Sequence, residues 1–264
     1  MLIVLAVPLA CTSPALAANT IRVYYAGPEG GVLTALGLAA DSSTGSGPRF
    51  EIVADPAQAD VFVLNGAAPD AEGIAVRVRA GAGLVLVLGP DLSAAEVETL
   101  LGVRVTLERK DEPLSLTPAR GAEDPLLTQI VWTSAPQVRE RFALASPASD
   151  LLPLVLGFED ASLILGTRQI GAGRAYVFTP FLDGANPQFQ GWAYFNYLVY
   201  HLAARAAGRT PASFAGYPGS PVPHARERAV LFVALAGMMG LAVLAFWLVR
   251  RYSQIGRASC RERV

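Results

Sequence analysis

The sequences ADVFVLNG at residues 59–66 and AGAGLVLVLGP at residues 80–90 decide the fold of this chain. Each contains a run of consecutive apolar residues rich in β-branched side chains, Val61 to Leu64 in the first and Leu84 to Leu88 in the second. Runs of this kind, closed by glycine or proline, are typical of strands buried on both faces of a parallel sheet. We therefore predict two parallel core strands here.

The segment between the two runs, Ala71 to Ala80, is long enough for a crossover helix. Ile74 and Val78 would face the sheet, with Arg77 and Arg79 on the solvent side. The unit is thus β-α-β, and its crossover is right-handed when both strands belong to one sheet.

The residues before this unit predict a strand, a helix and a second strand, at Ile21 to Tyr25, Val32 to Ala40 and Phe50 to Ala54. The turn Gly27 to Gly31 is rich in glycine, but its spacing fits neither the dinucleotide-binding motif nor the P-loop. We interpret it as a plain connection and expect no cofactor.

After Pro90, Ser93 stands three residues before Glu96, which is the spacing of a capping box. A helix is predicted from Ala94 to Leu101, where Gly102 would end it. Strands and helices alternate over this first part of the chain, so the sequence indicates an α/β fold.

From residue 103 onward the pattern is that of an antiparallel sheet. Val103 to Leu107 and Gln137 to Leu144 alternate as half-buried strands do. The sequence RQIGAGRAYVF at residues 168–178 reads as a β-hairpin. We predict that this half extends the parallel sheet or packs beside it.

The segment Asp183 to Arg205 would close the domain with a helix capped by Asn186. Its aromatic residues permit two interpretations. Trp192, Tyr194 and Tyr197 could form an aromatic surface that binds a sugar or protein partner, or the helix could lie against the sheet as core. Aromatic stripes at this spacing favour the second interpretation.

The composition indicates a membrane protein rather than a nucleic-acid-binding protein. A formal net charge of −1 gives no basic footprint, so we expect no nucleic-acid partner. The apolar fraction is 52% and the mean hydropathy is +0.39. Residues 1–17 resemble a secretory signal with the cleavage pattern Ala15-Leu16-Ala17.

A run without charges, Val230 to Val249, is long enough to span a bilayer and contact membrane lipid. It follows a Pro/Gly-rich linker at residues 208–229 and precedes Arg250 and Arg251, so residues 18–207 would form the α/β domain. We expect a single-pass protein of the cell membrane whose domain lies outside the cytoplasm, with residues 250–264 as a cytoplasmic flank. The end of that flank, IGRASCRERV, resembles a vector-derived string.

The phrases ADVFVLNG and RVRAGAGLVLVLGP resemble those of the class I glutamine amidotransferase-like domains of bacterial membrane proteins. Ala82 stands where those domains have one glycine of a triplet. DPLL at residues 124–127 and GAGRAYVFTPFLD at residues 171–183 resemble later phrases of the same family. The resemblance covers Ile21 to about Arg205. It implies a flavodoxin-like, three-layer α/β fold with a partly antiparallel C-terminal half, followed here by one transmembrane helix.

Catalytic members of that family use a cysteine at a sharp strand-to-helix turn, with a histidine and a glutamate. This chain has Cys11 and Cys260, both outside the domain, so we expect no thiol amidotransferase activity. The turn after the second core strand carries Asp91 and Ser93 instead. Together with His201, these are the only candidates for a catalytic role, and no spacing supports a metal site on Asp91, Asp183 and His201.

Three classes of function remain. The favoured one is a non-catalytic, membrane-anchored domain that binds a protein or glycan partner in the bacterial envelope, with Asp91, Asp183, Trp192, Tyr194 and Tyr197 as candidate binding residues. The second is a hydrolase on the same fold that uses no thiol. The third is an accessory subunit of a transporter or envelope complex. A cleft in which Asp91, Asp183 and His201 converge would favour the hydrolase.

Overall fold

The computed structural model describes residues 19–41, 45–145, 151–221 and 232–248. The chain divides into two units, Met1–Ser220 and Pro221–Val264. The expected signal segment and the expected cytoplasmic flank lie outside the described residues.

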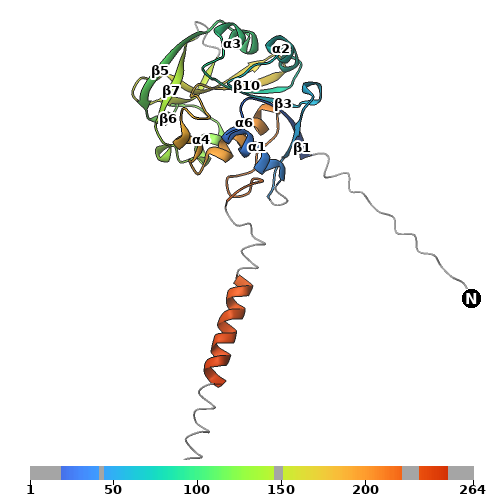
Figure 1. Ribbon diagram of the computed structural model, residues 1–264, viewed down its shortest axis with the longest axis vertical. Helices are drawn as coiled ribbons and strands as arrows, with labels where there is room; N and C mark the ends of the chain where they lie inside the picture. The colour runs from blue at the N-terminus through green and yellow to red at the C-terminus, as the bar shows by residue number, and fades with distance from the viewer. Residues whose placement is uncertain (1–18, 42–44, 146–150, 222–231, 249–264) are drawn as a thin grey trace, which may run out of the picture. The chain divides into compact units, whose positions relative to one another are not determined.

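The first unit is built on one eight-stranded mixed sheet (Figure 1). Its strand order is β2-β1-β3-β4-β10-β9-β8-β6. The first five of these strands run parallel, and the order 2-1-3-4 followed by a late strand is that of flavodoxin-like folds. The parallel strands are β1 (Thr20–Ala26), β2 (Arg49–Val53), β3 (Val61–Asn65), β4 (Gly83–Val87) and β10 (Gly173–Phe178).

The two apolar runs form adjacent parallel strands at the centre of the sheet, as predicted. Residues of β3 pair with β4 in parallel register, from Val61 opposite Gly83 to Asn65 opposite Val87. Every residue of both strands is buried, because helices cover both faces of the sheet. The crossover helix α2 (Ala71–Arg79) is also confirmed, and it buries Ile74 and Val78.

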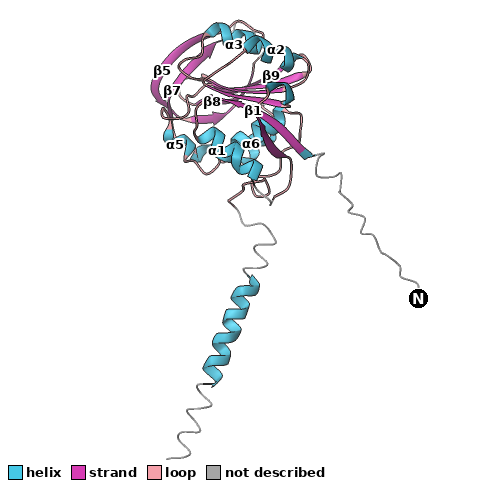
Figure 2. Ribbon diagram, turned by 45° about the vertical axis from the view of Figure 1, so that its right-hand side comes forward, coloured by secondary structure: helices cyan, strands magenta, loops and turns pink. Residues whose placement is uncertain are grey.

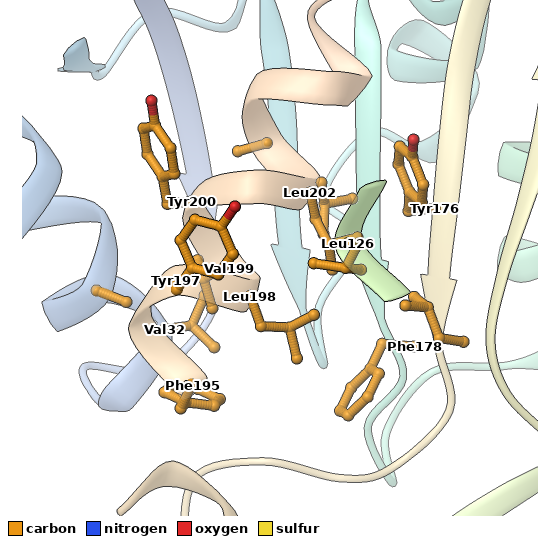
Figure 3. Packing of buried hydrophobic residues seen from close by; sticks show 14 of the residues in the cluster. Val32, Leu126, Tyr176, Phe178, Phe195, Tyr197, Leu198, Val199, Tyr200 and Leu202 are labelled. Atoms are coloured by element: carbon orange, nitrogen blue, oxygen red, sulfur yellow. The ribbon is translucent and has the colours of Figure 1, made fainter. Parts of the chain in front are cut away.

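Helices on both faces of the sheet give the first unit three layers (Figure 2). One face packs on α1 (Gly31–Asp41) and α6 (Phe195–Ala206), and the other packs on α2 and α3 (Ala94–Leu101). Figure 3 shows how the apolar side of α6, with Leu198 and Leu202, meets Phe178 of β10. The short helical segments are α4 (Pro125–Gln129), α5 (Pro187–Gln190), η2 (Pro56–Gln58) and η3 (Trp132–Ser134).

The C-terminal half is partly antiparallel, as predicted, since only β10 of its strands runs parallel, beside β4. The hairpin of β9 (Leu163–Ile170) and β10 adds β8 (Leu152–Gly157) and the short β6 (Leu116–Pro118) to the main sheet. The strands β5 (Thr106–Leu114) and β7 (Val138–Ala145) form a separate two-stranded sheet. Both predicted arrangements therefore occur, since three antiparallel strands extend the sheet and two pack beside it.

Asn186 does not cap a long closing helix, which corrects that prediction. Its side chain instead joins the start of β7 to the loop after β10: Oδ1 accepts from Arg139 N at 2.7 Å, and Nδ2 donates to Glu140 O at 2.9 Å and to Phe181 O at 2.8 Å. Pro187 starts only the short α5, and α6 begins separately at Phe195. As a cross-link the buried amide satisfies three backbone groups, whereas as a helix cap its oxygen would satisfy one backbone N–H.

The compact unit extends to Ser220, so the predicted linker at 208–229 begins too early. Tyr217 is 1% exposed and packs on Tyr197 and Tyr200, with ring centroids 5.2 Å apart in both pairs. The backbone of Gly216 also accepts from Ser46 N at 2.6 Å. The aromatic residues in this Pro/Gly-rich stretch therefore belong to the core.

In the second unit, residues 232–248 are helical. None of the helices in the described ranges combines the length and the hydropathy that crossing a membrane requires. The predicted span includes Val230, Leu231 and Val249, which lie outside those ranges.

Candidate functional site

A cleft of about 800 Å³ opens where the parallel strands end. Most of its lining comes from four connections: residues 26–28 after β1, 65–69 after β3, 88–92 after β4 and 181–185 after β10. Glu96 of α3 and Glu140 of β7 complete it. In open α/β sheets, ligands bind outside the carboxyl ends of the strands, at the point where the strand order reverses. The pair β1 and β3 forms that point here.

Glycines let the floor of this cleft close tightly. A Cβ on Gly89 would lie 2.5 Å from the Cα of Gly66, so the backbones after β3 and β4 almost touch. Gly66 itself has a φ of 69°, in the region that favours glycine. The glycines that close the two fold-defining runs are thus required by the close approach of their loops.

Asp183 connects the loop after β10 to the rest of the cleft. Its Oδ1 accepts from Gly31 N at 2.9 Å, at the start of α1, and its Oδ2 accepts from Nδ2 of Asn65 in a short hydrogen bond. A carboxylate in this position is stabilised by the helix dipole and satisfies one of the free backbone amides of the first turn. Gln190 Oε1 accepts from the same Gly31 N at 3.1 Å.

Asn65 and Tyr25 extend this network to the loop after β1. Asn65 is 3% exposed and also donates to the Tyr25 hydroxyl at 3.3 Å, and that hydroxyl donates to Pro28 O at 2.6 Å. Burial raises the pKa of Tyr25, and the hydrogen bond from Asn65 partly offsets that rise. The phenol is therefore a fixed neutral group.

Four carboxylates and no lysine, arginine or histidine line the cleft. Three of the four already have structural partners. Asp183 is held as described, Glu140 forms an ion pair with Arg109 at 2.7 Å, and Glu96 closes the capping box of α3. Asp91 is exposed and makes no hydrogen bond or ion pair with any described residue.

Ser93 performs the capping role that its spacing to Glu96 predicted. Its hydroxyl donates to Glu96 Oε2 at 2.7 Å, and its oxygen accepts from Glu96 N at 3.3 Å. These hydrogen bonds from Ser93 lower the pKa of Glu96. Ser93 is thus part of a helix cap at the predicted elbow, where its hydroxyl is bound to the capping carboxylate of Glu96.

His201 does not reach the cleft, so the arrangement of Asp91, Asp183 and His201 considered for a hydrolase or a metal site is not assembled. The imidazole is buried in α6, with Nδ1 3.3 Å from the Tyr197 hydroxyl and Nε2 3.4 Å from Asp124 Oδ1. Within the described ranges, no three His, Cys, Asp or Glu side chains are grouped as a metal ion requires.

The aromatic residues proposed as binding residues are mostly internal. Trp192 is 8% exposed and donates from Nε1 to the Ser134 hydroxyl at 3.1 Å. Tyr197 is fully buried, its hydroxyl donates to Gln129 Oε1, and burial raises its pKa. Tyr194 is half-buried and packs on Phe214, with ring centroids 4.6 Å apart. The core interpretation of this stripe is therefore confirmed.

Sequence reasoning did not select two polar residues that line the cleft, Asn65 and Glu140, nor Tyr25, whose hydroxyl accepts from Asn65. Asn65 carried a signal, since it is the polar residue that ends a fully apolar strand, and such positions face the carboxyl edge of the sheet. Glu140 carried none, because it comes from β7 of the separate sheet and its approach depends on tertiary packing.

No family model and no curated protein matches this chain at the level of sequence. Solved structures do show its fold. A cytoplasmic protein of Salmonella typhimurium LT2 aligns with a TM-score of 0.52 and 13% identity, over 69% of this chain and 99% of that protein. A ThuA-like protein from Parabacteroides merdae ATCC 43184 aligns with a TM-score of 0.50 and 11% identity, over 78% of this chain and 99% of that one. ThuA-like proteins have a class I glutamine amidotransferase-like fold, and this chain is similar to them in architecture.

Proposed function

We propose that this chain is a non-catalytic binding domain with a class I glutamine amidotransferase-like fold, and that the cleft at the carboxyl ends of its strands binds a glycan. The observation that carries the proposal is the lining of the cleft, which is rich in hydrogen-bond acceptors and free of cationic side chains. Carboxylates and an amide suit a ligand that donates many hydrogen bonds, as sugar hydroxyls and amino groups do. Anionic ligands would be repelled.

The state of the four carboxylates supports binding rather than hydrolysis. Glycosidases of the usual kind need two carboxyl groups free to act as acid and base or nucleophile. Here Asp183, Glu96 and Glu140 are engaged in a helix start, a helix cap and an ion pair. Of the four carboxylates, only Asp91 makes no hydrogen bond or ion pair with a described residue.

The test is calorimetric titration of the full chain, in a non-ionic detergent, with chitosan oligosaccharides and with their neutral N-acetylated counterparts. We expect saturable binding of at least one of these two sugars. Asp91→Asn should weaken that binding about tenfold, because a charged hydrogen-bond acceptor is lost. Glu72→Gln removes an exposed charge of α2 that does not line the cleft, and it should leave the affinity unchanged. Equal loss in both variants, or no binding of either sugar, would contradict the proposal.

A parallel assay distinguishes the hydrolase alternative. We expect no hydrolysis of glutamine and no cleavage of the oligosaccharides by the full chain. Turnover that survives iodoacetamide and disappears in Asp91→Asn would make the protein a hydrolase that uses no thiol.

We also propose that the run from Val230 to Val249 anchors the chain in the cell membrane, with the α/β domain outside the cytoplasm. The support is the pairing of this run with the signal-like residues 1–17. Protease added to spheroplasts of a producing strain should degrade the domain, and a domain that remains intact until the spheroplasts are lysed would contradict this topology.

A further inference from the structure

A second pocket, of about 480 Å³, lies at the other end of β10 from the acidic cleft. Four arginines and two carboxylates line it, so its charge balance is opposite to that of the cleft. We call it the arginine pocket. The arginines are Arg120 after β6, Arg168 of β9, Arg174 of β10 and Arg205 in the last turn of α6.

Two of these arginines are unused by the protein. The side chains of Arg120 and Arg174 make no hydrogen bond or ion pair with any described residue. Arg205 approaches Asp124 Oδ2 only at 3.9 Å, and its buried Nε has no hydrogen-bond partner among the described residues. Asp124 itself is shared with His201 and accepts from Leu126 N at 2.9 Å. The second carboxylate, Glu123, is exposed.

Tyr176 supplies an independent observation that points to a ligand. It is 1% exposed, lines the arginine pocket, and carries a buried hydroxyl with no hydrogen-bond partner among the described residues. Tyr176 and Arg174 stand two positions apart on β10, so both side chains leave the face of the sheet that α6 covers. Figure 3 shows the Tyr176 hydroxyl directed away from Phe178, toward the Arg174 end of the strand.

A buried hydroxyl without a partner is costly, and native proteins rarely keep one without a reason. An oxyanion would satisfy it, because it accepts several hydrogen bonds at once from a hydroxyl and from forked guanidinium groups. The volume exceeds what a bare phosphate fills, and the exposed Leu152 with Leu154 supplies an apolar wall. The ligand therefore carries an organic part as well as the anion.

We propose that the arginine pocket binds a phosphate ester, with Arg174, Arg205 and Tyr176 donating to the phosphate oxygens. The ester is either a soluble metabolite or a phospholipid headgroup, since both present the same chemistry. This site is separate from the glycan cleft, and it does not depend on the function proposed for that cleft.

The test is titration of the full chain, in a non-ionic detergent, with inorganic phosphate and with glycerol 3-phosphate. We expect saturable binding of glycerol 3-phosphate that Arg174→Gln weakens about tenfold or more, because a charged hydrogen-bond donor is lost. Tyr176→Phe should weaken binding several-fold without lowering the thermal midpoint, since the hydroxyl has no partner to lose in the free protein. Arg79→Gln removes the same charge from the exposed end of α2 and should leave the affinity unchanged.

A second arm identifies the source of the ester. The same variants are titrated with detergent micelles that contain phosphatidylglycerol, and with micelles that contain phosphatidylcholine as the reference. Binding to the phosphatidylglycerol micelles that depends on Arg174, without binding of glycerol 3-phosphate, assigns the site to a headgroup. The proposal is overturned if neither probe binds, or if Arg79→Gln weakens binding as much as Arg174→Gln does.

Discussion

Asp183 joins three parts of the first unit through one carboxylate while its own backbone lies in the left-handed region, at a φ of 56°. We expect Asp183→Ala to lower the free energy of unfolding by about 1–3 kcal/mol, because Gly31 N and the Asn65 amide lose an acceptor. Asp91→Ala is the matched control, since Asp91 lines the same cleft without a partner among the described residues. Urea denaturation of both variants checks the difference.

Asp183→Asn separates charge from geometry at this position. Asparagine tolerates the left-handed region and keeps one acceptor, but it loses the negative charge at the start of α1. Its stability should fall between that of the wild type and that of Asp183→Ala. A loss as large as that of the alanine variant would show that charge, rather than the hydrogen-bond acceptor, dominates.

Asp124 should contribute a pH-dependent part of the stability. Burial alone would raise its pKa, but the contact with His201, the hydrogen bond from Leu126 N and the nearby Arg205 lower it below the ordinary value of 3.8. A carboxyl whose folded-state pKa is depressed stabilises the protein above its unfolded pKa, and this contribution is lost as the pH falls through the folded pKa. We therefore expect Asp124→Asn to be less stable than the wild type at neutral pH, with the two thermal midpoints converging below that value.

At the scale of elements, the β9–β10 hairpin is seated against the end of α2. A Cβ on Gly173 would fall inside van der Waals contact of the carbonyl oxygens of Val78 and Ala82. Gly173→Ala should therefore destabilise the protein by about 1–3 kcal/mol, through overpacking against backbone that cannot move away. Thermal unfolding measured by circular dichroism is sufficient to detect it.

Gly37 provides the contrasting variant. It lies within α1, and a Cβ there would meet no atom within 4 Å. Gly37→Ala should raise the stability by about 0.5–1 kcal/mol, because alanine loses less conformational entropy in a helix. If both glycine variants shifted the midpoint in the same direction, packing at Gly173 would not be the cause.

The elements that could be predicted are those whose signal is local. The apolar runs at 61–64 and 84–88, the capping box at Ser93 and the hairpin at residues 168–178 all follow from neighbours in the sequence. Asn186 could not be predicted, because a capping residue and a buried amide cross-link have the same local sequence. Two of its three partners, Arg139 and Glu140, lie on a strand that is distant in the sequence.

The whole first unit depends on the segment that follows α6. Tyr217 fills a space beside Tyr197 and Tyr200, and burial raises its pKa to about 12. Tyr217→Ala should cost about 3–5 kcal/mol, since it leaves a large cavity among aromatic rings. Phe214→Ala, at a partly exposed ring in the same segment, should cost less. Guanidinium denaturation would rank the two, and the reverse order would show that Tyr217 is not part of the core.

The candidate site was predictable in position but not in composition. The glycines and Asp91 that follow the apolar strands indicated the carboxyl edge of the sheet, and the cleft lies there. The sequence places His201 on the closing helix α6, which made it a candidate for the site. It does not show how α6 is rotated about its axis, because packing sets that rotation, and the observed rotation directs the imidazole to Asp124. The sequence around Arg174 and Tyr176 indicates only an ordinary strand, because it does not reveal that the buried Tyr176 hydroxyl lacks a partner.

The place of β10 between β4 and β9 has a consequence for synthesis of the chain. During translation, β1 to β4 are complete long before β10 exists, so the edge of β4, with the sequence GLVLV, stays unpaired. An apolar edge strand of this kind promotes aggregation until its neighbour arrives. A fragment that stops at Ile170 should therefore form pelletable aggregates, whereas one that runs through Ser220 should not, which makes β10 the strand that protects the nascent protein.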